Sequence, residues 1–123
     1  MTVRRWLAVT LAIAIAAVAH RASAQDDQRC ANPPDFLTQS ICKTPALDDL
    51  DRMLRSTYDA LVSDSSPAVR DQVTGAQTAW TAKRDGCRDV PCLIALYHDR
   101  NDALAAQLAR PDPASAVTLE GKF

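Results

Sequence analysis

Residues 77–100 read QTAWTAKRDGCRDVPCLIALYHDR and contain the end of one predicted helix, a short turn and the start of the next. Trp80 closes a series of apolar residues spaced three or four apart, which is the period of one helix face. Gly86 stands where that helix must stop, and we expect it to adopt a left-handed cap. The next helix then begins at 89–91, because a proline in the first turn loses no hydrogen bond. The stretch predicts two helices joined by a turn that holds Cys87.

Similar start and stop signals lie on both sides of this stretch. Thr44-Pro45 and Ser66-Pro67 each predict the start of a helix, and Asp35 can cap a short helix that ends near Cys42. Arg110-Pro111 ends the last helix. No stretch after residue 30 alternates polar and apolar residues for long enough to predict a strand.

These signals predict an all-α fold, a small helical bundle. The second and third helices are joined by about three residues, so they form an antiparallel hairpin against which the fourth packs. We expect the apolar stripes to bury a common core: Leu47, Leu50, Leu54, Tyr58, Trp80, Leu93, Tyr97 and Leu104.

The start of the chain has the pattern of a secretory signal peptide. Arg4-Arg5 precedes an apolar run at 6–19, and Ala22-Ser23-Ala24 supplies a small-residue cleavage site. The run has 14 residues, whereas a membrane-spanning helix needs about 20. We therefore expect cleavage after Ala24 and localisation in the periplasm or outside the cell. The predicted organisation is a signal peptide at 1–24, a helical domain at 25–110 and a disordered tail at 111–123.

Cleavage would leave a small acidic chain of 99 residues, with 11 basic and 15 acidic side chains and a net charge of −4. This size and charge exclude a multidomain enzyme, a dinucleotide-binding fold and a basic nucleic-acid binder. Once the signal is removed, we expect no insertion into a membrane.

The four cysteines, Cys30, Cys42, Cys87 and Cys92, all follow the predicted cleavage site. An even number in a small exported domain predicts two disulfides, so we expect a disulfide-stapled bundle. Zinc would need four thiolates at ligand spacing, but the gaps of 11, 44 and 4 residues contain no paired Cys-x-x-Cys. We favour the local pairs Cys30–Cys42 and Cys87–Cys92, each worth about 2–3 kcal/mol. The cross-pairing Cys42–Cys87 with Cys30–Cys92 is an alternative.

The sequence does not predict an enzyme. His98 is the one histidine that remains after signal removal, and no nucleophile motif accompanies it. We expect it on the solvated face beside Asp99 and Asp102. The three glycines form no phosphate-binding loop, so we expect no cofactor, and with the cysteines oxidised we expect no metal.

Charged residues interrupt the apolar stripes at Asp51, Arg84 and Arg100. A charge among core residues normally needs a partner. We therefore expect a partly buried Asp51–Arg100 or Asp51–Arg84 pair that fixes the register of the helices, the alternative being that these residues line a cleft. Gln77 lies one turn before Trp80, and we expect it to form a hydrogen bond across the hairpin.

Together these residues form a pattern that resembles the LprI-like lysozyme-inhibitor N-terminal domain family. The pattern covers about residues 30–108 and reads Cys30-x(11)-Cys42, Leu47-x-x-Leu50-Asp51-x-x-Leu54-x-x-x-Tyr58, Gln77-x-x-Trp80-x-x-x-Arg84-Asp85-x-Cys87, Cys92-Leu93-x-x-x-Tyr97-x-x-Arg100. The resemblance implies a small exported bacterial helical protein that binds and inhibits lysozyme. The alternative is a structural or interaction module of the cell envelope without affinity for lysozyme.

If the chain inhibits lysozyme, the contact is expected in the segment 86–92. A disulfide that closes four residues, together with Pro91, would hold this segment in order before binding. Arg88 carries a guanidinium suited to a carboxylate, and Asp89 could bind arginines of a basic partner. Alternatively, the segment is only a stapled connection between helices, with Asp89 capping the second of them.

Overall fold

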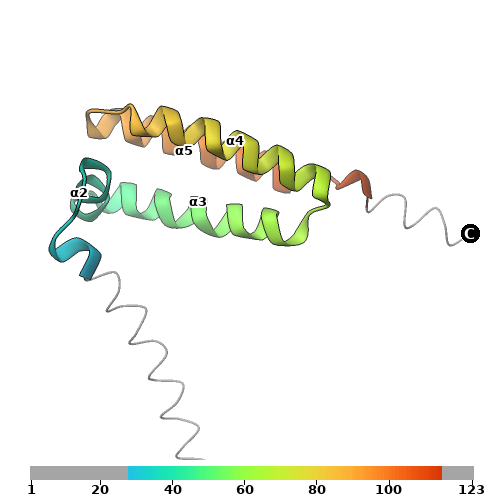
Figure 1. Cartoon of the computed structure of the whole chain (residues 1–123), viewed down its shortest axis with the longest axis horizontal. Coiled ribbons are helices and arrows are strands. Elements are labelled where there is room, and N and C mark those ends of the chain that lie inside the picture. The colour runs from blue at the N-terminus through green and yellow to red at the C-terminus, as the bar shows by residue number, and fades with distance from the viewer. Residues whose placement is uncertain (1–27, 115–123) are drawn as a thin grey trace, which may run out of the picture. The chain divides into compact units, whose positions relative to one another are not determined.

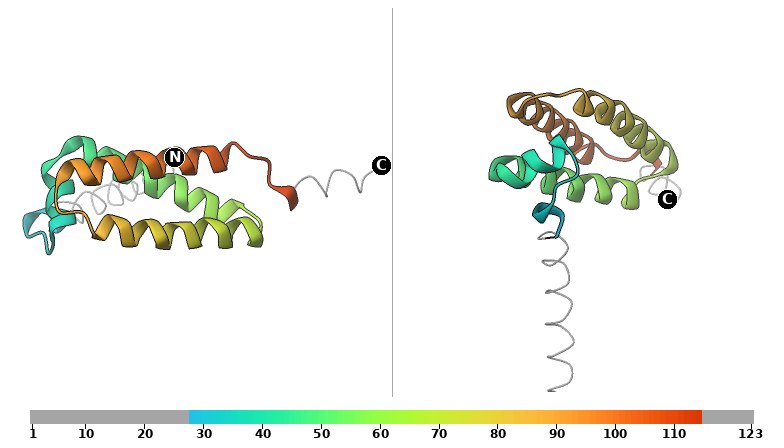
Figure 2. Two further views of the ribbon diagram at one scale, coloured as in Figure 1. Left: turned by 90° about the horizontal axis from the view of Figure 1, so that it is seen from above. Right: turned by 60° about the vertical axis from the view of Figure 1, so that its left-hand side comes forward.

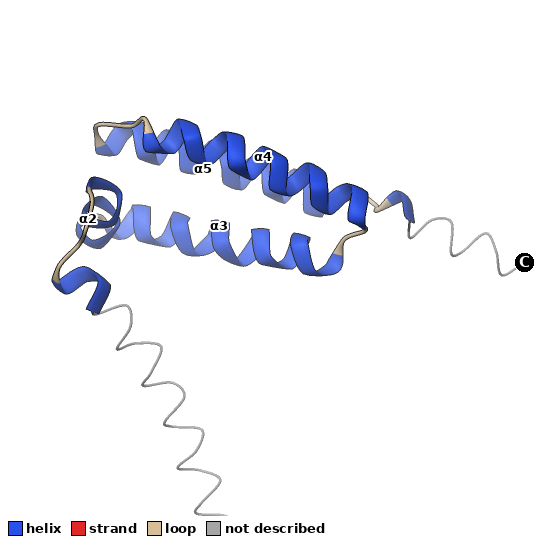
Figure 3. Ribbon diagram, viewed as in Figure 1, coloured by secondary structure: helices blue, strands red, loops and turns tan. Residues whose placement is uncertain are grey.

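The structure is a computed structural model that describes residues 28–114. These residues form four long or medium helices in chain order: α2 (Phe36–Lys43), α3 (Pro45–Asp64), α4 (Pro67–Asp85) and α5 (Val90–Leu108). Residues 28–114 contain no strand, so the all-α prediction is confirmed (Figure 3). The predicted signal peptide at 1–24 and the tail residues 115–123 lie outside the described residues.

The chain divides into two compact units, with the boundary between Gln39 and Ser40. In the first unit, the backbone N–H of Thr38 donates to Asp35 Oδ1 at 2.7 Å. Asp35 therefore caps the start of α2, as the sequence predicts, because its carboxylate satisfies an amide that has no partner within the helix.

The second unit is built around α3, α4 and α5. Ser65 and Ser66 alone connect α3 to α4, so these two helices run antiparallel. Helix α5 returns alongside α4 and packs mainly on α3, which gives a three-helix bundle (Figures 1 and 2). No helix among residues 28–114 is long and apolar enough to cross a membrane.

The core of the bundle lies along the facing sides of these helices. Of the eight predicted core residues, the structure buries six and leaves Leu50 and Tyr58 half-buried. Leu61 and Val73 also lie inside. The six buried residues are Leu47, Leu54, Trp80, Leu93, Tyr97 and Leu104.

Prolines begin the helices of the bundle as expected. Pro45 and Pro67 occupy the first turns of α3 and α4, and Pro91 lies in the first turn of α5. Proline is favoured there because its missing N–H would have no partner in the helix, and its fixed backbone angle suits the first turn.

Gly86 ends α4, but the expected left-handed conformation is wrong. Its φ is −79° and its ψ is −14°, within the right-handed helical region. The last turn tightens instead, because the amides of Gly86 and Cys87 donate to the carbonyls of Lys83 and Arg84 at 3.1 and 3.0 Å. These i to i+3 bonds satisfy the terminal carbonyls without a left-handed residue. A Cβ at Gly86 would lie 3.2 Å from the Lys83 carbonyl oxygen, which explains why a glycine fits there.

The chain just after α5, at the start of the predicted tail, makes hydrogen bonds through Asp112. Asp112 accepts a 2.7 Å hydrogen bond from the backbone N–H of Ser66 and a 3.0 Å hydrogen bond from the N–H of Ala114. These bonds lower the pKa of the Asp112 carboxyl, because they favour its charged form. Residues 111–114 are therefore tied to the α3–α4 turn, whereas the rest of the predicted tail lies outside the described residues.

Candidate functional site

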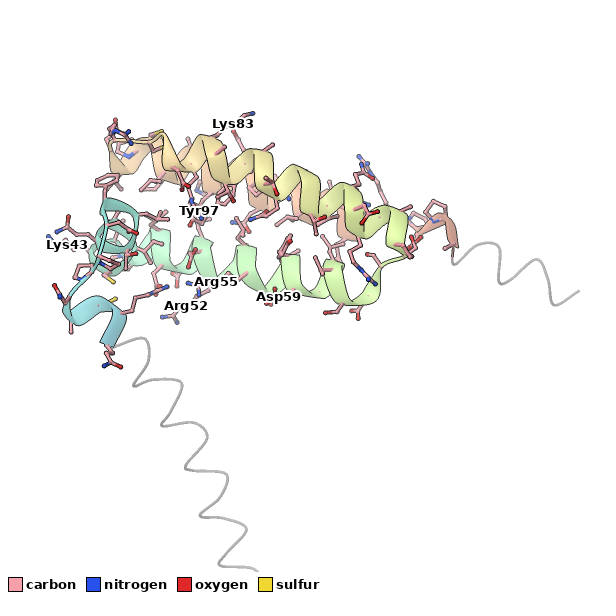
Figure 4. All side chains as sticks on the ribbon, in the orientation of Figure 1. Lys43, Arg52, Arg55, Asp59, Lys83 and Tyr97 are labelled. Carbon is pink, nitrogen blue, oxygen red and sulfur yellow. A yellow bond between two sulfur atoms is a disulfide. The ribbon has the colours of Figure 1, made fainter. Side chains whose placement is uncertain are left out.

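A chain of polar contacts crosses the interior of the bundle from α5 to α3. The hydroxyl of Tyr97, which is fully buried, donates to Asp51 Oδ1 at 2.8 Å. Asp51 Oδ2 accepts hydrogen bonds from Nε of Arg55 at 2.9 Å and from Nη2 of the same guanidinium. Figure 4 shows Tyr97 in the space between α5 and α3, with Arg55 on α3. Burial, and after it the charge of Asp51 and their hydrogen bond, raise the pKa of the Tyr97 hydroxyl far above its ordinary value.

The structure therefore corrects the predicted partners of Asp51. Neither Arg84 nor Arg100 pairs with this carboxylate among the described residues. Arg55 lies four residues after Asp51 on the same helix, where two oppositely charged side chains meet without any change of backbone. The Tyr97 hydroxyl fills the remaining side of the carboxylate, so neither Arg84 nor Arg100 is needed to satisfy it.

Arg84 instead belongs to an aromatic cluster between α4 and α5. Its guanidinium lies 5.3 Å from the centre of the Trp80 ring and pairs with the neighbouring Asp85 at 2.8 Å. Trp80 meets Tyr97 edge to face, with ring centres 5.0 Å apart, and its indole N–H donates to the Leu96 carbonyl at 2.9 Å. The indole N–H and the Tyr97 hydroxyl both have hydrogen-bond partners, so these residues stabilise the packing of α5 on α4.

Arg100 forms a second polar contact between the same helices. Its Nε donates to Gln77 Oε1 at 2.8 Å, and its Nη2 donates to the Val73 carbonyl at 3.2 Å. Gln77 therefore bonds across to α5 rather than across the α3–α4 hairpin, which corrects its predicted partner. Burial lowers the pKa of the Arg100 guanidinium.

Asn101 supplies a polar contact that the sequence analysis missed. Its side-chain amide donates to the Leu50 carbonyl on α3 at 3.1 Å. No apolar or charge pattern marks an asparagine of this kind, because its amide can point either into solvent or towards a neighbouring helix.

The loop between α4 and α5 is closed by a disulfide. Cys87 bonds to Cys92, with Cα atoms 5.7 Å apart, and this local pairing confirms one of the two favoured bridges. The cross-pairing alternative is therefore wrong, and Cys30 and Cys42 are disulfide-bonded as well. The reason is geometric: the short turn places Cys87 and the first turn of α5 at the Cα separation that a disulfide requires.

Both predicted contact residues of the loop have interactions inside it. Arg88 is exposed, and its Nη1 donates to the Asp85 and Cys87 carbonyls at 3.1 Å each. Asp89 Oδ1 accepts from the Cys92 backbone N–H at 2.8 Å and so caps α5. Asp89 thus performs the structural role that the sequence allowed for it, whereas Arg88 is exposed on the surface.

The remaining candidate residue, His98, is exposed on α5. Residues 28–114 contain no group of three or more His, Cys, Asp or Glu side chains placed to hold a metal ion.

Comparisons with protein families, curated proteins and solved structures found no match to this chain. The structure separates the candidate side chains into two groups. Asp51, Trp80, Tyr97 and Arg100 hold the bundle together from inside, whereas the loop that contains Arg88 is presented to solvent.

Proposed function

We propose that the mature chain is an exported, non-enzymatic protein that binds and inhibits lysozyme through the loop at 86–92. The observation that carries the proposal is the Cys87–Cys92 bridge, which closes this loop between two helices while Arg88 stays exposed on it. The pattern of cysteines, Trp80 and Arg84 that resembles the lysozyme-inhibitor family supports the choice of partner.

The loop is suited to binding because it is ordered before it meets a partner. Both of its ends are helix termini, and the cap by Asp89 and the Arg88–carbonyl bonds fix its backbone further. Ordering a side chain on binding costs about 0.5–1.5 kcal/mol, and a preformed loop avoids most of this cost. The contacts of a rigid loop therefore contribute to affinity without first offsetting the cost of ordering the loop.

Arg88 is the group on the loop with the chemistry to recognise lysozyme. Its Nη1 donates to the two loop carbonyls, and Nε and Nη2 form no hydrogen bond with another described residue. Two parallel N–H groups match the two oxygens of a carboxylate, and such charge-assisted pairs are the strong ones. The catalytic cleft of lysozyme contains two carboxyl groups, so it offers a partner of this kind.

Charge and redox chemistry favour the same proposal. A mature net charge of −4 would speed the encounter with a cationic lysozyme and make binding weaker at high salt. Two disulfides are typical of a protein that folds in an oxidising compartment, which agrees with export.

The experiment is a lysis assay on bacterial cell walls with oxidised mature protein and lysozyme. We expect wild-type protein to slow lysis, and Arg88→Glu to weaken inhibition about 10- to 100-fold, as the loss of an interface arginine does. Arg70→Glu is the matched control, since Arg70 is an exposed arginine beside the α3–α4 turn, and it should inhibit like wild type. Unchanged lysis at a large molar excess of wild-type protein would refute the proposal.

A structural or interaction module of the cell envelope is the alternative function. A pull-down from envelope extract separates the two. A reproducible envelope partner together with no lysozyme binding would favour the alternative, whereas retention of lysozyme by the wild-type protein but not by Arg88→Glu would favour inhibition.

A further inference from the structure

A groove of about 250 Å³ lies between α4 and α5, on a part of the bundle that the proposed loop contact does not use. Its walls are mainly aliphatic, with Val73 and Ala76 on α4 and Ala103 and Leu104 on α5. Its polar lining comes from two arginines, Arg100 on α5 and Arg110 just beyond the end of α5, and from the side chains of Gln72 and Gln107.

Arg100 is a buried charge with no acidic partner among the described residues. The residue is only 9% exposed, and the ion pairs found in residues 28–114 do not include it. Its two hydrogen-bond partners, the Gln77 amide oxygen and the Val73 carbonyl, are both neutral. Buried charges are normally paired with an opposite charge, because desolvation otherwise opposes burial.

The guanidinium also has donors to spare. Arginine has five N–H donors, of which the Gln77 and Val73 oxygens use one each. Nη1 forms no hydrogen bond within the described residues. It is also not one of the fully buried atoms without a partner, so it is accessible. Because Arg100 also lines the groove, an anion that enters it can reach these remaining donors.

We propose that this groove binds a short-chain aliphatic carboxylate, with the carboxylate on Arg100 and the hydrocarbon chain along Val73, Ala76 and Ala103. The carboxylate supplies the charge that Arg100 lacks, and the aliphatic walls favour an apolar chain over a fully polar anion. Arg110, which also lines the groove, adds a second positive charge that attracts the ligand. The size is sufficient, because an apolar cavity of about 150 Å³ already takes up benzene.

The test is a titration of ¹⁵N-labelled mature protein with hexanoate, followed by amide chemical shifts. We expect saturable shifts at the groove residues of α4 and α5. 1-Hexanol has the same chain without the charge, and acetate has the charge without the chain, so each should bind about tenfold more weakly or worse. The proposal would be overturned if 1-hexanol shifted the groove amides with the same titration midpoint as hexanoate. It would also be overturned if hexanoate caused no shifts at the groove.

A pair of leucine substitutions keeps the test independent of Arg100 itself. Ala103→Leu fills the groove and should abolish the hexanoate shifts, whereas Ala95→Leu on the same helix lies away from the groove and should leave them unchanged. Both positions are exposed and helical, so leucine is tolerated in either. Unaltered hexanoate binding in Ala103→Leu would refute the assignment. The result does not depend on lysozyme, so it stands or falls separately from the proposed inhibition.

Discussion

The Tyr97 hydroxyl on α5 donates a 2.8 Å hydrogen bond to the Asp51 carboxylate on α3, 46 residues away in the chain. Each residue makes the burial of the other acceptable: the phenol has an acceptor, and the carboxylate has a donor besides its helical neighbour Arg55. The same Tyr97 ring meets Trp80 on α4. One side chain of α5 thus contacts both of the other helices and fixes the register of the bundle.

Tyr97→Phe should destabilise the protein by about 1–3 kcal/mol. The substitution keeps the ring and its packing on Trp80, but it leaves a buried oxygen of Asp51 without the phenolic donor. Urea unfolding followed by helical circular dichroism measures the change. Tyr58→Phe is the control, since Tyr58 is half-buried and its hydroxyl has no hydrogen bond to another described residue. An equal decrease in the free energy of unfolding of the two variants would show that the Tyr97–Asp51 hydrogen bond does not stabilise the fold.

Stability should fall in alkaline solution through Tyr97. Its folded-state pKa is raised by burial and by Asp51 above the ordinary value of 10.0. The contribution of Tyr97 is therefore complete below pH 10, and it declines as pH rises above 10, because only the unfolded chain then releases the phenolic proton. The free energy of unfolding should decrease above pH 10 less steeply in Tyr97→Phe than in wild type, since lysine ionisation is common to both. Parallel pH profiles would contradict the burial of this hydroxyl.

Replacing both Cys87 and Cys92 by serine should cost about 2 kcal/mol of stability, as expected for so short a closed loop. The helices should remain, because Cys87 is one buried residue of a core that α3, α4 and α5 otherwise form with their apolar side chains. Hydrogen exchange should become faster at the amides of the loop and of the first turn of α5. Unchanged exchange there would show that the helix ends alone order the loop.

Asp89→Ala should lower the free energy of unfolding by about 1 kcal/mol, because the Cys92 amide loses its cap. Asp89→Asn should lower it much less. Urea unfolding of the three proteins compares them directly. The asparagine variant keeps the cap and removes the charge, so its inhibition of lysozyme also separates the two roles of Asp89. If the two substitutions destabilise equally, the charge of Asp89 matters and the cap does not.

The sequence predicted the helices well because local rules decide them. Proline positions and three- or four-residue apolar spacing depend on a few neighbouring residues, and they led to the bounds of α3, α4 and α5 within a few residues. The tertiary partners of charged side chains depend on helix rotation, which spacing does not fix. Arg55 was overlooked as the partner of Asp51, although its position four residues later is a local signal that could have revealed it.

The remaining differences have similar causes. The sequence predicts a left-handed Gly86 because glycine often ends helices in this conformation. In the structure, a tight last turn satisfies the terminal carbonyls of α4 without it. The Asp112–Ser66 hydrogen bond joins segments 46 residues apart, and no local pattern in either segment predicts that the two meet. Of the candidate site, the cysteine pair and the cap by Asp89 followed from local sequence. The groove at Arg100 did not, because it exists only where α4 and α5 meet.

The most direct test of the central claim is an amide chemical-shift map of ¹⁵N-labelled mature protein with unlabelled lysozyme added. The account predicts shifts or line broadening concentrated at residues 86–92 and the adjoining ends of α4 and α5, and their loss in Arg88→Glu. No perturbation at equimolar lysozyme, or a perturbed surface elsewhere on the bundle with the loop unaffected, would contradict it.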